Sequence, residues 1–179
     1  MLLLNNQIYG LTKGQSSPTS PLGATTKSTP YGSIDQPISP LTFALTSRAT
    51  FVARVNDTDK KLMREVFRRS ETHKGVAFIE VLSNCITFND GPFADISKRA
   101  SRDNYRLVLE HGQPMIYGVD RKKGIVNRGG KLLPVDLDGK RYTEEDVVIY
   151  DARSEDPTLA FQMANISNLG GPITLGVVS

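Results

Sequence analysis

Leu2-Leu3-Leu4-Asn5-Asn6-Gln7-Ile8-Tyr9-Gly10-Leu11-Thr12-Lys13-Gly14-Gln15 opens the chain with an apolar run that ends abruptly in two carboxamides. A polar loop punctuated by glycine follows. A buried parallel strand delivers polar groups in this way to a site at its C-terminal edge. An isolated Asn-Asn pair more often only begins a turn, but amide and carbonyl oxygens are also hard ligands suited to Mg²⁺. The segment therefore predicts a strand over residues 2–6 whose end presents oxygen ligands to a metal ion.

The next segments predict the alternation of strands and helices that is typical of an α/β fold. Ser39-Pro40 favours the start of a short helix. Residues 50–55 and 76–82 are mostly apolar and are expected to be strands, and residues 59–73 have the apolar spacing of a helix. Strand, helix and strand in this order imply a right-handed parallel crossover.

Residues 10–40 are rich in Gly, Ser, Thr and Pro, which is typical of a long loop or a disordered linker. The character changes again after residue 90, and we expect an α+β extension over residues 90–179 that packs on, or reaches away from, the α/β part over residues 1–89. Its expected elements are helices over residues 101–111 and 157–166 and short strands over residues 114–117, 124–126, 132–136 and 147–150.

Composition excludes several classes of protein. The net charge is only +3, and the densest basic cluster, Arg121-Lys122-Lys123, is too small to indicate a nucleic-acid partner. Met1–Leu4 is too short for a signal peptide, and no run reaches the ~18 apolar residues of a membrane span, so a cytoplasmic protein without membrane contact is expected. Cys85 is the single cysteine, which excludes an intrachain disulfide and a metal site built from this chain's cysteines alone.

The segment Asn5–Gln15 resembles the distal half of the thiamine diphosphate motif of 2-oxoacid:ferredoxin oxidoreductase β subunits. Further stretches are similar to the same family, in order and over nearly the whole chain. They are Ser17-Pro18-Thr19-Ser20, Thr26–Gly32, Ala49–Arg54, Phe78–Cys85, Leu109–Gly118 and Lys123-Gly124-Ile125.

The resemblance implies a thiamine diphosphate and Mg²⁺ site at the end of the first strand. It implies that Asn6 supplies a side-chain ligand to Mg²⁺ and Ile8 a backbone carbonyl, and that Lys13 is a catalytic residue on the substrate side. The loop over residues 16–33 would then be an ordered wall over the site. The residues that would line the cofactor are Tyr9, Gly10, Leu11 and Thr12.

The sequence allows two interpretations of Cys85. A lone buried cysteine is more often a small hydrophobic residue than a ligand. The resemblance implies instead that it is the fourth thiolate of a 4Fe-4S cluster whose other three cysteines lie near the N-terminus in that family. Four thiolates are the normal set, so the ligand set within this chain is incomplete.

The family's upstream Gly-Asp-Gly element, whose aspartate is the other protein ligand to Mg²⁺, is absent from this sequence. We therefore expect a partial thiamine diphosphate-binding parallel sheet of the pyrimidine/pyrophosphate type, flanked by helices. The chain would be a fragment, or a short subunit that another chain completes.

The activity implied by the resemblance is oxidative decarboxylation of a 2-oxoacid with coenzyme A, with electrons passed to ferredoxin and an α subunit as partner. Residues 89–93, Asn-Asp-Gly-Pro-Phe, resemble family members that act on 2-oxoglutarate rather than on pyruvate. Two alternatives remain open: a carboligase of the acetohydroxyacid synthase type, and a truncated, non-catalytic docking subunit.

Overall fold

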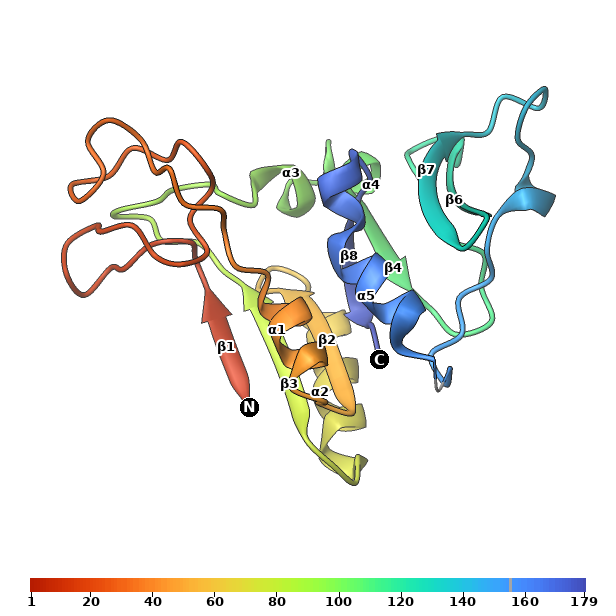
Figure 1. The fold of residues 1–179 in the computed structure, drawn as a ribbon, viewed down its shortest axis with the longest axis horizontal. Coiled ribbons are helices and arrows are strands. Elements are labelled where there is room, and N and C mark those ends of the chain that lie inside the picture. The colour runs from red at the N-terminus through yellow and green to blue at the C-terminus, as the bar shows by residue number, and fades with distance from the viewer. Residues whose placement is uncertain (155) are drawn as a thin grey trace.

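A computed structural model describes residues 1–154 and 156–179. The described residues form a five-stranded sheet in the order β1-β3-β2-β8-β4 and a separate three-stranded sheet in the order β5-β6-β7 (Figure 1). The elements are β1 (Leu2–Asn5), α1 (Pro40–Thr46), β2 (Phe51–Asn56), α2 (Lys60–Thr72), β3 (Ala77–Leu82), α3 (Ala94–Ser97), α4 (Arg102–Tyr105), β4 (Arg106–Leu109), β5 (Ile116–Tyr117), β6 (Lys123–Arg128), β7 (Lys131–Asp136), η1 (Glu144–Asp146), α5 (Pro157–Asn165), η2 (Ile166–Leu169) and β8 (Ile173–Val177).

The predicted parallel part of the sheet is confirmed. Strands β1 and β2 both run parallel to β3, which lies between them. The two helices of this part begin at side-chain caps: Ser39 accepts a hydrogen bond from the Thr42 amide at 3.3 Å, and Asp59 accepts one from the Leu62 amide at 3.1 Å. Such caps satisfy amides that a helix start leaves without partners, and they explain why the helix boundaries could be predicted closely.

Helices cover both faces of this sheet (Figure 1). Helices α1 and α5 pack on one face, which carries Val52 and Phe78, and α2 packs on the other, which carries Ala53, Val55 and Ile79. Residues alternate between the two faces along each strand. The α/β class with helices flanking a largely parallel sheet is therefore confirmed.

The predicted helix over residues 101–111 is wrong. Only Arg102–Tyr105 is helical, and Arg106–Leu109 is strand β4, which pairs in parallel with β8. His111 therefore follows a strand, and its Nδ1 lies 3.3 Å from an Asp151 carboxylate oxygen. The sequence of β4 is too short to indicate a strand by itself, and its pairing partner lies more than sixty residues away.

Two further features differ from the sequence-based expectations. Strand β8 was not predicted, and it pairs antiparallel to β2, so the sheet is mixed rather than purely parallel. The expected strand over residues 147–150 is reduced to isolated bridges, Val126 with Val147 and Pro114 with Ile149. Because β4 and β8 extend the sheet begun by β1, β2 and β3, both parts of the chain share one sheet, and the division after residue 89 stays a prediction.

Within the described residues, every helix is too short or too polar to cross a membrane.

Tyr150 links the segment before α5 to strand β8. It is 1% exposed, and its hydroxyl donates a hydrogen bond to the Val177 carbonyl. The same burial raises the pKa of this phenol above its usual value. We predict that Tyr150→Phe lowers the free energy of unfolding by about 1–2 kcal/mol, because the buried carbonyl loses its donor.

Urea denaturation measures this loss. Tyr105→Phe is the control, since Tyr105 is 52% exposed, and it should stay within about 0.5 kcal/mol of the parent protein. Equal stability of both variants would contradict the assigned role of Tyr150.

Candidate functional site

The candidate site begins at Asn5, the last residue of β1, whose buried carboxamide makes contacts at both of its ends. The amide oxygen accepts hydrogen bonds from the Gln7 backbone N–H at 3.1 Å and from the Thr19 hydroxyl at 2.8 Å. The amide nitrogen donates to a Glu80 carboxylate oxygen at 2.7 Å. Asn5 thus joins the strand end, the following turn and the neighbouring strand β3.

Asn6 continues the turn away from the sheet. Its side-chain oxygen accepts a hydrogen bond from the Ile8 backbone N–H at 3.2 Å. Its backbone carbonyl accepts one from the side-chain amide nitrogen of Asn89 at 2.8 Å. Gln7 has a φ of 56°, which is an uncommon conformation for a residue with a side chain. The Ser20 hydroxyl donates to the Gln7 carbonyl at 2.7 Å, so contacts from distant segments hold this turn in place.

The turn lines a cavity of about 420 Å³. Asn6 and Ile8 lie in its wall, together with apolar residues such as Leu3, Pro18 and Phe78, and the wall contains no Asp or Glu among the described residues. The Ile8 carbonyl accepts no hydrogen bond within the part of the chain that the structure describes, and the Asn6 amide oxygen keeps a second lone pair.

These groups fit the donor chemistry of Mg²⁺. The cation takes oxygen ligands in octahedral geometry, and it usually keeps waters and substrate phosphates as part of its set. A wall that supplies only neutral oxygens leaves the charge of the cation to be balanced by an anionic group such as a diphosphate. Asn6 and Ile8 can therefore hold Mg²⁺ as minority ligands of a metal bound to a phosphate-bearing cofactor.

The segment over residues 9–15 closes on itself as a loop. Tyr9 and Gln15 form a backbone bridge, with the Tyr9 N–H donating to the Gln15 carbonyl at 2.9 Å. The Tyr9 carbonyl also accepts from the Gly14 N–H at 3.0 Å and from the Thr12 hydroxyl at 3.3 Å. Internal hydrogen bonds, rather than burial, fix the shape of this loop.

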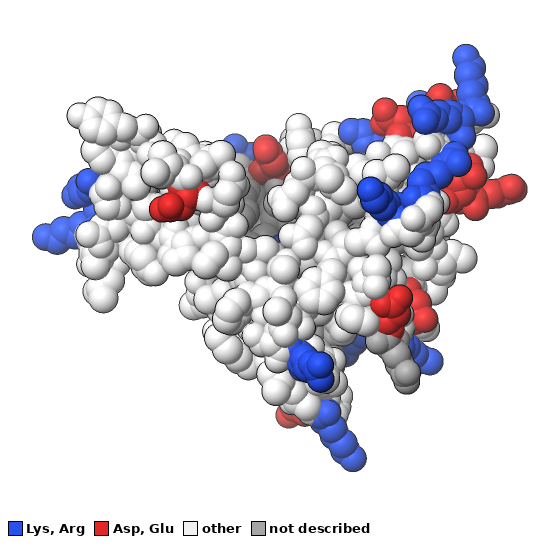
Figure 2. Space-filling view, in the orientation of Figure 1, with Lys and Arg blue, Asp and Glu red and all other residues white. Residues whose placement is uncertain are grey.

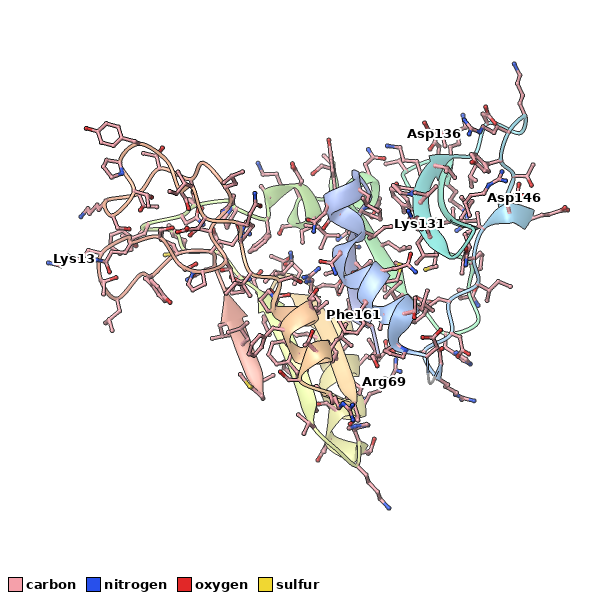
Figure 3. All side chains as sticks on the ribbon, in the orientation of Figure 1. Lys13, Arg69, Lys131, Asp136, Asp146 and Phe161 are labelled. Carbon is pink, nitrogen blue, oxygen red and sulfur yellow. The ribbon has the colours of Figure 1, made fainter. Side chains whose placement is uncertain are left out.

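The tip of this loop points away from the rest of the chain. Lys13 projects outward at the far end of the molecule (Figure 3), and Leu11 is 99% exposed. The structure thus brings Asn6 and Ile8 into one cavity wall, while Lys13 and Leu11 reach into the space beyond it. Gly10 is part-buried at the base of the same loop.

The loop over residues 16–33 is ordered by its own hydroxyl groups. The Ser20 hydroxyl accepts from the Ser17 N–H at 2.9 Å, and the hydroxyls of Thr26 and Thr29 lie 2.9 Å apart. The Gly23 N–H donates to the Ser33 carbonyl at 2.7 Å. The interpretation as an ordered segment fits these contacts, and its links to Asn5 and Gln7 place it beside the candidate site.

Cys85 lies next to the loop that carries the other candidate residues. It follows β3 in a short turn closed by Asn89, whose N–H donates to the Cys85 carbonyl at 2.9 Å. A Cβ placed on Gly10 would come within 3.8 Å of the Cys85 sulfur. In the described residues, three or more His, Cys, Asp or Glu side chains never gather into a group that could hold a metal ion, so Cys85 has no companion ligands there.

Comparison with known proteins identifies the chain's relatives. Residues 1–81 match the family "Thiamine pyrophosphate enzyme, C-terminal TPP binding domain". The chain is 39% identical to the 2-oxoglutarate oxidoreductase subunit KorB of Mycobacterium tuberculosis, over 94% of this chain and 44% of that protein. It is 47% identical to the 2-oxoacid:ferredoxin oxidoreductase subunit beta of Saccharolobus solfataricus, over 50% of this chain and 30% of that protein.

A solved structure is similar to this chain over nearly its whole length. The 2-oxoglutarate:ferredoxin oxidoreductase from Magnetococcus marinus, with 2-oxoglutarate, coenzyme A and succinyl-CoA bound, superposes with a TM-score of 0.65 at 26% identity, over 99% of this chain and 45% of that one. Over nearly its whole length the chain is thus similar to subunits of 2-oxoacid oxidoreductases. The resemblance inferred from the sequence is therefore confirmed, and the chain spans less than half the length of the M. tuberculosis relative.

The thiamine pyrophosphate match covers the strand end, the turn and the loop described above, and it ends at residue 81, before Cys85. The roles of Asn6, Ile8, Tyr9–Lys13 and Cys85 stay predictions.

Sequence reasoning missed Glu80 and Arg54. They face each other across β3 and β2, and the Arg54 Nε lies 2.6 Å from a Glu80 carboxylate oxygen. The available signal was a single charged residue inside each of two mostly apolar strands. A charge at such a position is almost never fully buried unless it is paired.

Proposed function

We propose that this chain forms part of the β subunit of an oxidoreductase that converts a 2-oxoacid and coenzyme A to acyl-CoA and CO₂, and passes two electrons to ferredoxin. The observation that carries the proposal is the carboxamide turn after β1, which lies in a cavity wall within a segment that matches thiamine pyrophosphate enzymes. The names and bound ligands of the relatives support the substrates.

Asn6 and Ile8 would hold Mg²⁺ through the side-chain and backbone oxygens described above. When bound, thiamine diphosphate supplies the electron sink that makes decarboxylation of a 2-oxoacid feasible. The backbone of Tyr9, Gly10, Leu11 and Thr12 would line the cofactor, and glycine at position 10 lets the main chain approach it closely. These residues bind and orient, and they need no proton exchange of their own.

Lys13 would bind the carboxylate of the 2-oxoacid. Its ammonium group is carried outward on the loop tip, where no carboxylate of the described chain forms an ion pair with it. A cation placed there attracts an anionic substrate and offsets its charge on binding. Because the tip leaves this chain's surface, the rest of the substrate pocket would come from the α subunit.

We propose 2-oxoglutarate as the preferred substrate, with pyruvate second. The M. tuberculosis relative is named as a 2-oxoglutarate oxidoreductase subunit, and the M. marinus enzyme binds 2-oxoglutarate and coenzyme A. The cytoplasmic location expected from the sequence stays a prediction.

A non-catalytic docking subunit is the second candidate. Strand β1 lies at an open edge of the sheet, and its Leu2 and Leu4 are 59% and 73% exposed. An apolar strand edge of this kind pairs readily with another polypeptide. An activity assay of the assembled complex separates these functions. Reduction of ferredoxin with 2-oxoglutarate and coenzyme A that is lost on Asn6→Ala indicates a catalytic role, and reduction that Asn6→Ala leaves unchanged indicates a docking role. Acetolactate formation from pyruvate would indicate a carboligase.

We predict that Asn6→Ala weakens the binding of Mg²⁺ and thiamine diphosphate to the assembled complex. The loss should exceed the roughly 10- to 100-fold that removal of a metal's outer-shell partner costs, because Asn6 would contact the cation itself. Isothermal titration calorimetry measures it. Asn127→Ala is the control, because the Asn127 amide oxygen also accepts a backbone N–H within a turn, at 2.9 Å, but far from the site. Unchanged binding by Asn6→Ala would refute the metal assignment.

We predict that Lys13→Gln raises the KM for 2-oxoglutarate by roughly tenfold or more, because a hydrogen bond to a charged group contributes about 1.5–3 kcal/mol. Cofactor binding should change little. Lys27→Gln is the matched control: Lys27 is exposed, and its backbone N–H lies 3.4 Å from the Gly14 carbonyl of the same loop. Steady-state kinetics distinguish the two variants, and equal KM values would contradict a substrate role for Lys13.

We further propose that Cys85 is one thiolate ligand of a 4Fe-4S cluster whose other ligands lie outside this chain. Its position beside Gly10 would put the cluster close to the cofactor loop, which suits electron transfer. We predict that Cys85→Ser lowers the iron and sulfide content of the assembled complex, measured chemically and by absorbance. Thr87→Ala, an exposed neighbour, should retain both. Full iron content in Cys85→Ser would rule out ligation by this residue.

A further inference from the structure

Glu80 and Arg54 form an ion pair inside the sheet. Glu80 is 1% exposed and Arg54 9% exposed. They occupy paired positions of β3 and β2 and share the face that α1 covers. Replacing a buried ion pair by apolar residues is often neutral or stabilising, so stability alone is a weak reason for this pair.

Each carboxylate oxygen of Glu80 has one protein donor. One oxygen accepts from the Arg54 Nε at 2.6 Å and the other from the Asn5 amide nitrogen at 2.7 Å. Arg54 holds the carboxylate in one orientation, because hydrogen bonds between charged groups are short and directional. Glu80 therefore presents a fixed acceptor to Asn5.

This acceptor decides which way the Asn5 carboxamide points. An ionised carboxylate accepts hydrogen bonds only, so the nitrogen of the carboxamide must face Glu80 and its oxygen must face the turn. That oxygen receives the Gln7 N–H and the Thr19 hydroxyl. A reversed carboxamide would set its NH₂ group against the Gln7 N–H and leave both donors without an acceptor.

The turn needs this support because Gln7 has a φ of 56°. A residue with a side chain in such a conformation costs of order 1–3 kcal/mol and persists only where the surroundings determine it. The same turn sets the position of Asn6 and of the Ile8 carbonyl, which follow Asn5 directly along the chain.

We propose that Glu80, held by Arg54, is a positioning residue that acts through Asn5 to fix the turn that binds Mg²⁺ and the cofactor diphosphate. The positioning of the turn stands on this chain's contacts alone, whereas its consequence for the cofactor rests on the proposed function. Glu80 touches neither metal nor cofactor in this role. It acts through a hydrogen bond to a residue of the turn that would hold the metal. The loss of such outer contacts lowers metal affinity roughly 10- to 100-fold.

Glu80→Gln tests the proposal, because glutamine offers one acceptor and one donor where Glu80 offers two acceptors. It cannot serve both Arg54 and the Asn5 amide nitrogen in their present orientation. Val55→Ala is the control for lost stability: Val55 is fully buried in β2 but lies on the opposite face, packed with α2.

Two measurements compare these variants. Hydrogen exchange is measured in the chain alone for a peptide covering residues 5–9 and for a reference peptide from β6 and β7. In Glu80→Gln the 5–9 peptide should accelerate more than the reference peptide. In Val55→Ala the two peptides should accelerate by the same factor. Calorimetry of the assembled complex with Mg²⁺ and thiamine diphosphate should show roughly 10- to 100-fold weaker binding for Glu80→Gln and near-parent binding for Val55→Ala.

A double variant adds a rescue test that a merely structural role would fail. In Asn5→Asp/Glu80→Gln, the glutamine oxygen can accept from Arg54 while its nitrogen donates to the new aspartate, whose other oxygen still faces the Gln7 N–H. The double variant should restore slow exchange over residues 5–9. Where Glu80→Gln fails to fold, Arg54→Lys carries the comparison, because lysine lacks the planar guanidinium that orients Glu80 while Asn5 keeps its own contacts to the turn. It too should speed exchange over residues 5–9 more than Val55→Ala does.

The outcomes are separable. Equal effects of Glu80→Gln and Val55→Ala on exchange over residues 5–9 would overturn the positioning role. If the parent complex binds no Mg²⁺ and thiamine diphosphate, the proposed function fails, while the exchange comparison still decides how Glu80 acts on the turn. Faster exchange with unchanged cofactor affinity would show that the turn is positioned by Glu80 but does not bind the diphosphate, which also overturns the proposal.

Discussion

The turn after β1 is the constraint on which the candidate site depends. Where a strand ends inside a protein, its backbone N–H and C=O groups lose their sheet partners and need others. Side chains supply them here: Asn5 and Asn6 accept the next N–H groups, Ser20 donates to the Gln7 carbonyl, and Asn89 donates to the Asn6 carbonyl. Segments far apart in the sequence therefore meet at one turn.

These contacts explain how the separate features of the molecule come together. Ser20 draws in the loop over residues 16–33, and Asn89 draws in the turn that carries Cys85. The cysteine consequently lies against Gly10 although the two are far apart along the chain. The space-filling view shows few charged residues over the β1 and α1 side of the molecule, with Lys, Arg, Asp and Glu gathered mainly at its edges (Figure 2). The surface on this side of the molecule is thus largely uncharged.

Local signals in the sequence predicted the first half of the fold, and non-local pairing limited the rest. The caps at Ser39 and Asp59 and the carboxamides after β1 are recognisable without a partner. Strand β4 can be recognised only from its pairing with β8, which lies far away in the sequence. The helix over residues 101–111 was predicted because local signals do not show that pairing. Within the candidate site, the strand-end pattern indicated Asn6 and Ile8, which lie in one cavity wall and whose roles stay predictions. Glu80 was missed because its partners, Arg54 and Asn5, are set by the register of the sheet.

The charge balance of the site argues that this chain supplies one side of a shared pocket. The cavity wall around Asn6 and Ile8 offers neutral oxygens. The carboxylate of Glu80, which contacts the same turn through Asn5, already accepts hydrogen bonds from Arg54 and Asn5. A divalent cation held by neutral ligands alone binds weakly, so its affinity must come from anionic groups, a diphosphate above all. Lys13 and Leu11 extend beyond the wall, and an apolar strand edge lies beside it. A facing surface would complete each of these features, and the proposed function therefore places the remaining ligands and the substrate pocket on a second polypeptide surface.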